Sequence, residues 1–219
     1  MASRSKQPAP RPAPRLYLIT PQLADTSAFF PQLRIALDGG DIAAVLLRLA
    51  DADERSLINR AKSVAAATQD KGAALLLDGR VDLVARAGSD GAHLTGIAAF
   101  TGSLEQLKPD RIVGAGGLAS RHDAMLVAER GADYVMFGEP DAAGKRPAFA
   151  SIEERVAWWA ELFEIPCIGY AASIDEVAPL VAAGADFVAI GDFLWHEPNA
   201  IAEVISEATR RLQLPEPAA

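Results

Sequence analysis

The sequence is poor in the residues that mark several common classes of protein. Its 219 residues include one cysteine, Cys167, which excludes an internal disulfide and favours a reducing compartment, so we expect a cytoplasmic protein. No continuous apolar run approaches the roughly 20 residues that would cross a bilayer. Positive charge is in deficit, with a formal net charge of −8. Membrane and nucleic-acid partners are therefore not expected, and we expect a small-molecule substrate instead.

Composition divides the chain into one folded domain and two short ends. Half of the residues are hydrophobic, which suffices for one full-sized core. Residues 1–14 carry four prolines and three basic residues without a continuous apolar segment, so we expect a disordered leader rather than a secretory signal. Residues 213–219 are expected to be a frayed tail, which leaves 15–212 as the domain. Cys167 lies in an apolar run of this domain, and we interpret it as a buried strand residue rather than a nucleophile.

One short phrase recurs in the sequence and indicates the architecture. The letters GAD at 131–133 precede the apolar run 134–137, the same letters at 184–186 precede 187–190, and a looser copy starts at Gly88. Each copy follows an amphipathic helical stretch, so we expect the glycine to end the helix in the left-handed conformation and the aspartate to begin a strand. Short runs that are apolar on both faces are typical of buried strands. Such units in series predict a parallel sheet, whose ligands bind beyond the carboxyl ends of the strands.

Eight units of this kind fit between residues 15 and 212. We expect strands at 16–20, 43–49, 73–77, 91–94, 111–115, 133–137, 165–170 and 186–190, each followed by a helix or a helical stub. This count predicts an α/β fold with a single (β/α)8 barrel. An open doubly wound sheet is the alternative, and it would need the last two units to be flanking additions. We expect Ser27 to cap a helix, and Ser151 and Ser173 to begin capping boxes with the glutamates three residues later.

Several stretches of the sequence resemble the thiamine phosphate synthase and thiazole tautomerase family. They are 16–20, 45–51, 78–83, 89–94, 131–138 and 184–190, and the resemblance extends over roughly 15–212. It implies a barrel and a cytoplasmic transferase of thiamine biosynthesis that joins a hydroxymethylpyrimidine pyrophosphate to a thiazole phosphate. In this family Mg²⁺ and cationic side chains hold the leaving pyrophosphate, so the resemblance implies Mg²⁺ as the cofactor.

The metal-binding positions of the family hold other residues here. The Asn-Asp pair that follows strand three in the family reads Asp78 and Gly79, and the second metal-binding aspartate falls near Ala98. Asp78 is therefore the remaining metal candidate. Regular alternation along the strand would point its side chain to the face opposite the usual ligand.

The anion-binding positions differ as well. Of the family's Q-x-R-x-K pattern on strand two only Arg48 remains, and of its Thr-x-Thr-Lys loop only Lys145. The Ser-Thr-His after strand five reads Gly-Gly-Leu at 116–118, the Gly-Gly after strand seven reads Ala-Ala at 171–172, and the serine after strand eight is Asp192. A carboxylate 4 Å from a phosphate costs about 4 kcal/mol at an effective dielectric near 20. We therefore expect phosphate to bind weakly and the active site to be degenerate.

Three residues are candidates for the chemistry. His93 and Lys145 are the candidate catalytic residues, and Arg48 together with Lys145 would hold pyrophosphate if the transfer occurs. Each has a structural alternative: Arg48 in an ion pair with Asp78, His93 as a hydrogen-bonded core residue, and Lys145 as a solvated loop side chain.

Four residues follow strands six and eight, where the fold places its ligands. Gly138, Glu139, Gly191 and Asp192 are expected to contact the substrate. With Asp78, the two acidic residues among them predict an acidic mouth, which suits a metal or a cationic ligand. Each acidic residue is also a common helix cap or loop charge.

Two other functions remain open. A thiazole tautomerase would share the barrel and need an acid–base residue but no metal, and His93 is its candidate. A non-catalytic barrel would bind a ligand or partner without turnover. Trp158 and Trp159 are adjacent on a predicted helix, so one is expected to face outward, which suits a homo-oligomer contact.

Overall fold

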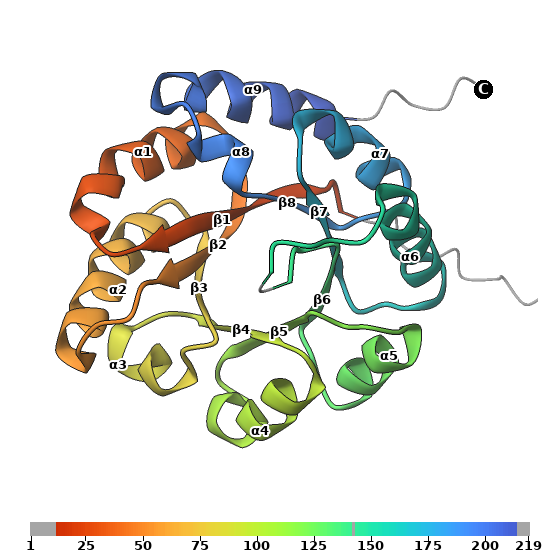
Figure 1. The fold of residues 1–219 in the computed structure, drawn as a ribbon, viewed down its shortest axis with the longest axis horizontal. Helices are drawn as coiled ribbons and strands as arrows, with labels where there is room; N and C mark the ends of the chain where they lie inside the picture. Colours follow the sequence, from red (N-terminus) through yellow and green to blue (C-terminus); the bar gives the residue numbers. More distant parts are fainter. Residues whose placement is uncertain (1–11, 142, 214–219) are drawn as a thin grey trace, which may run out of the picture.

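The computed structural model describes residues 12–141 and 143–213, which form a closed barrel of eight parallel strands in sequence order (Figure 1). The (β/α)8 fold expected from the sequence is confirmed. The leader lies outside the described residues except for 12–14, and the tail lies outside them except for residue 213, so both expectations about the ends stay predictions.

The strands form a ring, and the helices surround it (Figure 1). The strands are β1 (Arg15–Leu23), β2 (Ile42–Leu49), β3 (Ala74–Asp78), β4 (Gly91–Thr95), β5 (Ile112–Gly116), β6 (Tyr134–Phe137), β7 (Cys167–Ala171) and β8 (Phe187–Ile190). The helices are α1 (Thr26–Gly39), α2 (Glu54–Gln69), α3 (Val84–Ala87), α4 (Ile97–Leu107), α5 (Arg121–Glu129), α6 (Phe149–Leu162), α7 (Val177–Ala182), α8 (Asp192–Trp195) and α9 (Ile201–Leu212). All eight expected strands are present, and the short α8 between β8 and α9 was not expected.

The recurring aspartates join neighbouring strands at the amino-terminal end of the barrel. Each carboxylate accepts a hydrogen bond from a backbone N–H of the preceding strand, and the aspartate's own N–H donates to the carbonyl of that same residue. The pairs are Asp90 with Leu75, Asp133 with Val113 and Asp186 with Cys167, at Oδ2–N distances of 2.7, 2.7 and 2.8 Å. The glycines before them have φ values of 70°, 98° and 96°, as the expected left-handed helix ends require. The repeated aspartate therefore fixes the register of β4 on β3, of β6 on β5 and of β8 on β7.

Three expected helix caps differ from those in the structure. Asp25, not Ser27, caps α1, because its carboxylate accepts both the N–H and the hydroxyl of Ser27. Helix α6 starts at Phe149, which packs on the core, so Ser151 already lies inside its first turn. Ser173 makes no side-chain cap bond. Spacing alone did not predict these caps, because α1 and α6 begin earlier than expected, whereas Ser173 is at the expected N-cap position but its side chain makes no cap bond.

The apolar side chains form two layers, one on each side of the strands. The outer layer lies between strands and helices and includes Cys167, which is fully buried as expected, and Trp159. The inner layer fills the barrel and consists of Tyr17, Ile19, Ala44, Leu46, Leu76, Tyr134, Met136, Ile168, Tyr170 and Ala189. Trp158 is the outward-facing tryptophan, and the Arg121 guanidinium lies 4.8 Å from its ring centroid. No partner chain is present, so an oligomer contact there stays a prediction.

Candidate functional site

Two adjoining cavities open at the carboxyl ends of the strands. The larger cavity, of about 790 Å³, has walls from β1, β2, β3, β4 and α8, and the smaller cavity, of about 470 Å³, has walls from β4, β6, α6 and the loop after β5. Thr95, Pro140 and Asp141 line both. The segment between β6 and α6 extends toward the centre of the ring in Figure 1, and its residues Pro140 and Asp141 contribute to the walls of both cavities. Both cavities thus lie where the fold class predicts a ligand site.

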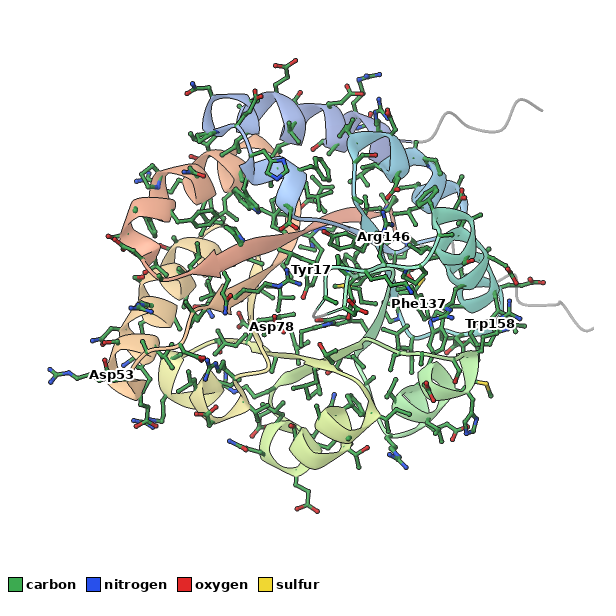
Figure 2. All side chains as sticks on the ribbon, viewed as in Figure 1. Tyr17, Asp53, Asp78, Phe137, Arg146 and Trp158 are labelled. Carbon is green, nitrogen blue, oxygen red and sulfur yellow. The ribbon has the colours of Figure 1, made fainter. Side chains whose placement is uncertain are left out.

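Arg48 and Asp78 form an ion pair in the larger cavity. The Nε–Oδ2 distance is 3.3 Å, and each side chain is about one-third exposed. Leu46 and Leu76 precede them by two residues and face the barrel interior, so strand alternation turns Arg48 and Asp78 to the same side. The expectation that Asp78 would point away from the mouth is therefore wrong (Figure 2). The ion pair that was the structural alternative for Arg48 is present.

The larger cavity holds a second arginine that the sequence reasoning missed. Arg80 lines it together with Asp192, which begins α8 as an expected carboxylate of the mouth. Arg80 forms an ion pair with Asp51, whose side chain is 93% exposed. Its position two residues beyond the end of β3 was the one available signal. Both arginines of this cavity therefore already contact a carboxylate.

A third carboxylate, that of Glu176, binds both an arginine and the backbone of the turn after β7. Both oxygens of Glu176 accept hydrogen bonds from Arg146, at 3.0 and 2.9 Å, and one also accepts the N–H of Ala172, at 2.7 Å. Arg146 also donates to the carbonyls of Gly138 and Tyr170, which fixes the segment between β6 and α6 to β7 (Figure 2). This is why Glu176 does not complete the expected capping box. The resemblance places a phosphate-binding loop at this turn. Here the N–H group of Ala172 instead donates to the carboxylate of Glu176.

A chain of buried polar groups runs through the barrel beneath the smaller cavity. Tyr17 Oη and Tyr134 Oη are 2.9 Å apart, and Tyr134 Oη is 2.9 Å from His93 Nδ1. His93 Nε2 lies 3.5 Å from Glu139 Oε1. His93 is 2% exposed and lines neither cavity, whereas Glu139 lines the smaller one. Burial raises the pKa of both tyrosines, and the negative charges of Glu139 and Asp78 raise them further.

Two glycines of β5 make room for this chain. A Cβ on Gly114 would lie 1.9 Å from Cζ of Tyr134, and a Cβ on Gly116 would lie 1.9 Å from Oε1 of Glu139. Gly116, which stands where the resemblance places a serine, is therefore small because Glu139 lies against it. A side chain at position 116 would displace Glu139.

The remaining expected residues differ in how directly they face a cavity. Lys145 is exposed and lines the smaller cavity, as does Gly138. Arg155, which the sequence reasoning missed, lines it too, and donates to the carbonyls of Leu118 and Ala119. Gly191 precedes α8 and lines neither cavity. Its role as a substrate contact stays a prediction.

The residues at the mouth do not form a protein-built Mg²⁺ site. Within residues 12–141 and 143–213, no three His, Cys, Asp or Glu side chains converge on one point. Asp78 already pairs with Arg48. In the resemblance, the usual ligand position is Gly79 and the second falls near Ala98. Mg²⁺ in enzymes of this kind needs one or two carboxylates besides the substrate phosphates. The donor set therefore fits the ion poorly.

No helix in the described part of the chain has the length and hydropathy to span a membrane.

Comparison with known proteins gives consistent matches over most of the chain. Residues 16–193 match the family model described as thiamine monophosphate synthase. A thiamine-phosphate synthase of Rhodospirillum centenum is 39% identical over 199 residues, which cover 90% of this chain and 96% of that protein. Another, of Hyphomonas neptunium, is 37% identical and covers 89% and 92%. The solved thiamine phosphate pyrophosphorylase from Pyrococcus furiosus has a TM-score of 0.73 at 21% identity, with 90% and 95% covered, a likeness of fold.

Proposed function

The chain belongs to the thiamine monophosphate synthase family, and we propose from this premise that it acts in thiamine biosynthesis as a transferase of the thiamine phosphate synthase type. In this reaction a hydroxymethylpyrimidine pyrophosphate is joined to a thiazole phosphate, and pyrophosphate leaves. A cytoplasmic location belongs to the same proposal, and the buried Cys167 is consistent with it.

The pair of adjoining cavities is the observation that supports a two-substrate reaction. Each cavity can hold one heterocyclic ring, and both have cationic side chains in their walls: Arg48 and Arg80 in the larger, and Lys145, Arg146 and Arg155 in the smaller. Their shared boundary at Thr95 would bring the two rings together. Cations at both places suit two anionic substrates and a leaving group that gains charge.

The internal carboxylates make this a slow transferase in our proposal. Pyrophosphate has to displace the carboxylate of Asp78 from the half-buried Arg48. It also has to displace Asp51 from Arg80, and this ion pair is readily broken because Asp51 is almost fully exposed. No step is assigned to Mg²⁺, because the donor set fits it poorly. Asp192 faces the same cavity and opposes a bound phosphate.

Replacing Arg80 with alanine is expected to lower kcat/KM for the pyrimidine pyrophosphate at least about tenfold, since a charge-assisted hydrogen bond contributes about 1.5–3 kcal/mol. The measurement is a steady-state assay of thiamine phosphate formation from the two substrates with Mg²⁺. Arg34→Ala, at an exposed position on α1, is the matched control and should leave the rate unchanged. Equal rates for the two variants would show that the larger cavity does not bind pyrophosphate. Absence of any product with the unmodified protein would remove the transferase proposal.

A second candidate is an acid–base isomerisation of the thiazole tautomerase type. The contact between His93 and Glu139 favours it, because Glu139 connects a buried imidazole to the smaller cavity. His93→Gln should reduce such activity at least about a hundredfold, the usual contribution of a positioned acid or base. His122→Gln, on the exposed start of α5, is the control. Unchanged isomerisation by the His93 variant would reject this candidate.

A thermal-shift screen separates both enzymes from a non-catalytic barrel. Mg²⁺, pyrophosphate, thiazole phosphate and thiamine phosphate are added singly and in pairs. A transferase is stabilised by both heterocycles and a tautomerase by the thiazole alone. A non-catalytic barrel shows no stabilisation that depends on Mg²⁺, and activity assays detect no turnover with either substrate set.

A further inference from the structure

We propose that Glu139 recognises the amino group of an aminopyrimidine ring that binds in the smaller cavity. The proposal deepens the function given above, because the pyrimidine substrate of that reaction carries such a group, and it rests on that function for the identity of the ligand. It names a specificity-determining contact: the carboxylate oxygen Oε2 accepts an N–H of the ligand.

The first argument is the unmatched oxygen of Glu139. The side chain is nine-tenths buried and lines the smaller cavity. Oε1 lies 3.5 Å from His93 Nε2, whereas Oε2 is buried and has no hydrogen-bond partner among the described residues. An unpaired buried acceptor is costly, and a carboxylate can accept only, so its missing partner has to be a donor.

The second argument is that the surrounding backbone is shaped to hold the carboxylate in this position. Gly138 has a φ of 96°, a left-handed conformation that turns the chain at the end of β6 so that Glu139 folds back over the barrel. Gly116 of the neighbouring strand has no side chain, so its backbone lies directly against the carboxylate. A Cβ at this position would lie within 2 Å of Oε1 of Glu139. Two glycines, one at the end of β5 and one directly after β6, thus fix one acidic side chain in place, which is more than a solvated loop charge requires.

The third argument is the chemistry of the cavity wall. Leu118, Met136 and Phe137 supply apolar surface suited to a flat ring. The pyrophosphate arm of such a ring would extend past the shared boundary at Thr95 to Arg48 and Arg80 in the larger cavity. About 470 Å³ is ample for one such molecule. A metal ion fits less well, because the described residues bring no second and third ligand to Glu139.

The test uses the unphosphorylated ring, so that binding is measured apart from turnover and from phosphate recognition. Calorimetry with 4-amino-5-hydroxymethyl-2-methylpyrimidine is compared with the same ring lacking the amino group. We expect the unmodified protein to bind the amino compound at least about tenfold more tightly. Glu139→Gln, which keeps the volume next to Gly116, should lose about tenfold in affinity for the amino compound, and Glu161→Gln, on the exposed face of α6, should lose none.

Two outcomes overturn the proposal: equal affinity of the unmodified protein for the two rings, or an unchanged affinity in Glu139→Gln. The first comparison needs no variant, so a Glu139→Gln protein that fails to fold does not remove the test. Failure of the transferase proposal is distinguishable, because amino-dependent ring binding without thiamine phosphate formation supports the contact with Glu139 and removes only the reaction.

Discussion

Replacing Gly114 with alanine is expected to lower the free energy of unfolding by about 3 kcal/mol, the upper part of the range for overpacking a well-filled core. The new Cβ would lie 1.9 Å from Cζ and 2.2 Å from Oη of Tyr134. The ring cannot retreat easily, because Tyr17 contacts it edge-on and His93 stacks against it. Gly114 does not have a positive φ, so the cost arises from packing and not from backbone conformation. Urea denaturation followed by circular dichroism measures it.

Two variants test the cause of this loss. Gly102→Ala, on α4 with no heavy atom within 4 Å of the new Cβ, is the control and should stabilise the protein by up to about 1 kcal/mol. Tyr134→Leu removes the clashing ring, so the alanine at 114 should cost less in that background, with a coupling energy of about 1–3 kcal/mol. Additive effects of the two substitutions would contradict the packing explanation.

The fold could be predicted from local sequence because its defining signals are local. Each copy of the GAD phrase contains the glycine that ends one helix and the aspartate that begins the next strand, and the structure adds that the carboxylate bonds the preceding strand. Short apolar runs then have one option, a buried parallel strand. The short helix after Asp192 gave no comparable signal, since it is a single turn whose Trp195 donates to the carbonyl of Ile19 across 176 residues.

The site could be predicted only in part, because its decisive contacts join residues far apart in the sequence. Arg48 and Asp78 were assigned to strand ends correctly. The direction of the Asp78 side chain depended on the register of β3 against β2, which the sequence around Asp78 does not indicate. Glu176 looked like a helix cap, and its pairing with Arg146 requires the segment after β6 to cross to β7. The sequence offered the ion pair of Arg48 with Asp78 as an alternative, but it did not indicate that Asp51 contacts Arg80 or that Glu176 contacts Arg146.

Raising the pH above 10 is expected to destabilise the protein steeply through Tyr17 and Tyr134. An unfolded tyrosine ionises near pH 10, whereas burial raises the pKa of both side chains in the folded state. The folded state therefore retains protons that the unfolded state releases. Stability is fully present below pH 10 and falls as the pH rises further, by about 1.4 kcal/mol per pH unit for each tyrosine.

The slope of stability against pH distinguishes this cause from the general loss of positive charge in alkali. Urea midpoints are measured between pH 9 and 11 for the unmodified protein and for Tyr17→Phe/Tyr134→Phe. The double variant loses the hydrogen bonds to His93 and between the two rings, so its stability is lower at every pH, but its slope should be shallower by about 2.8 kcal/mol per pH unit at the upper end of the range. Lysine deprotonation affects both proteins alike and cancels in the difference. Parallel curves would mean that the two phenols ionise in the folded barrel as readily as in water, and the buried chain from Tyr17 to Glu139 would then be open to solvent.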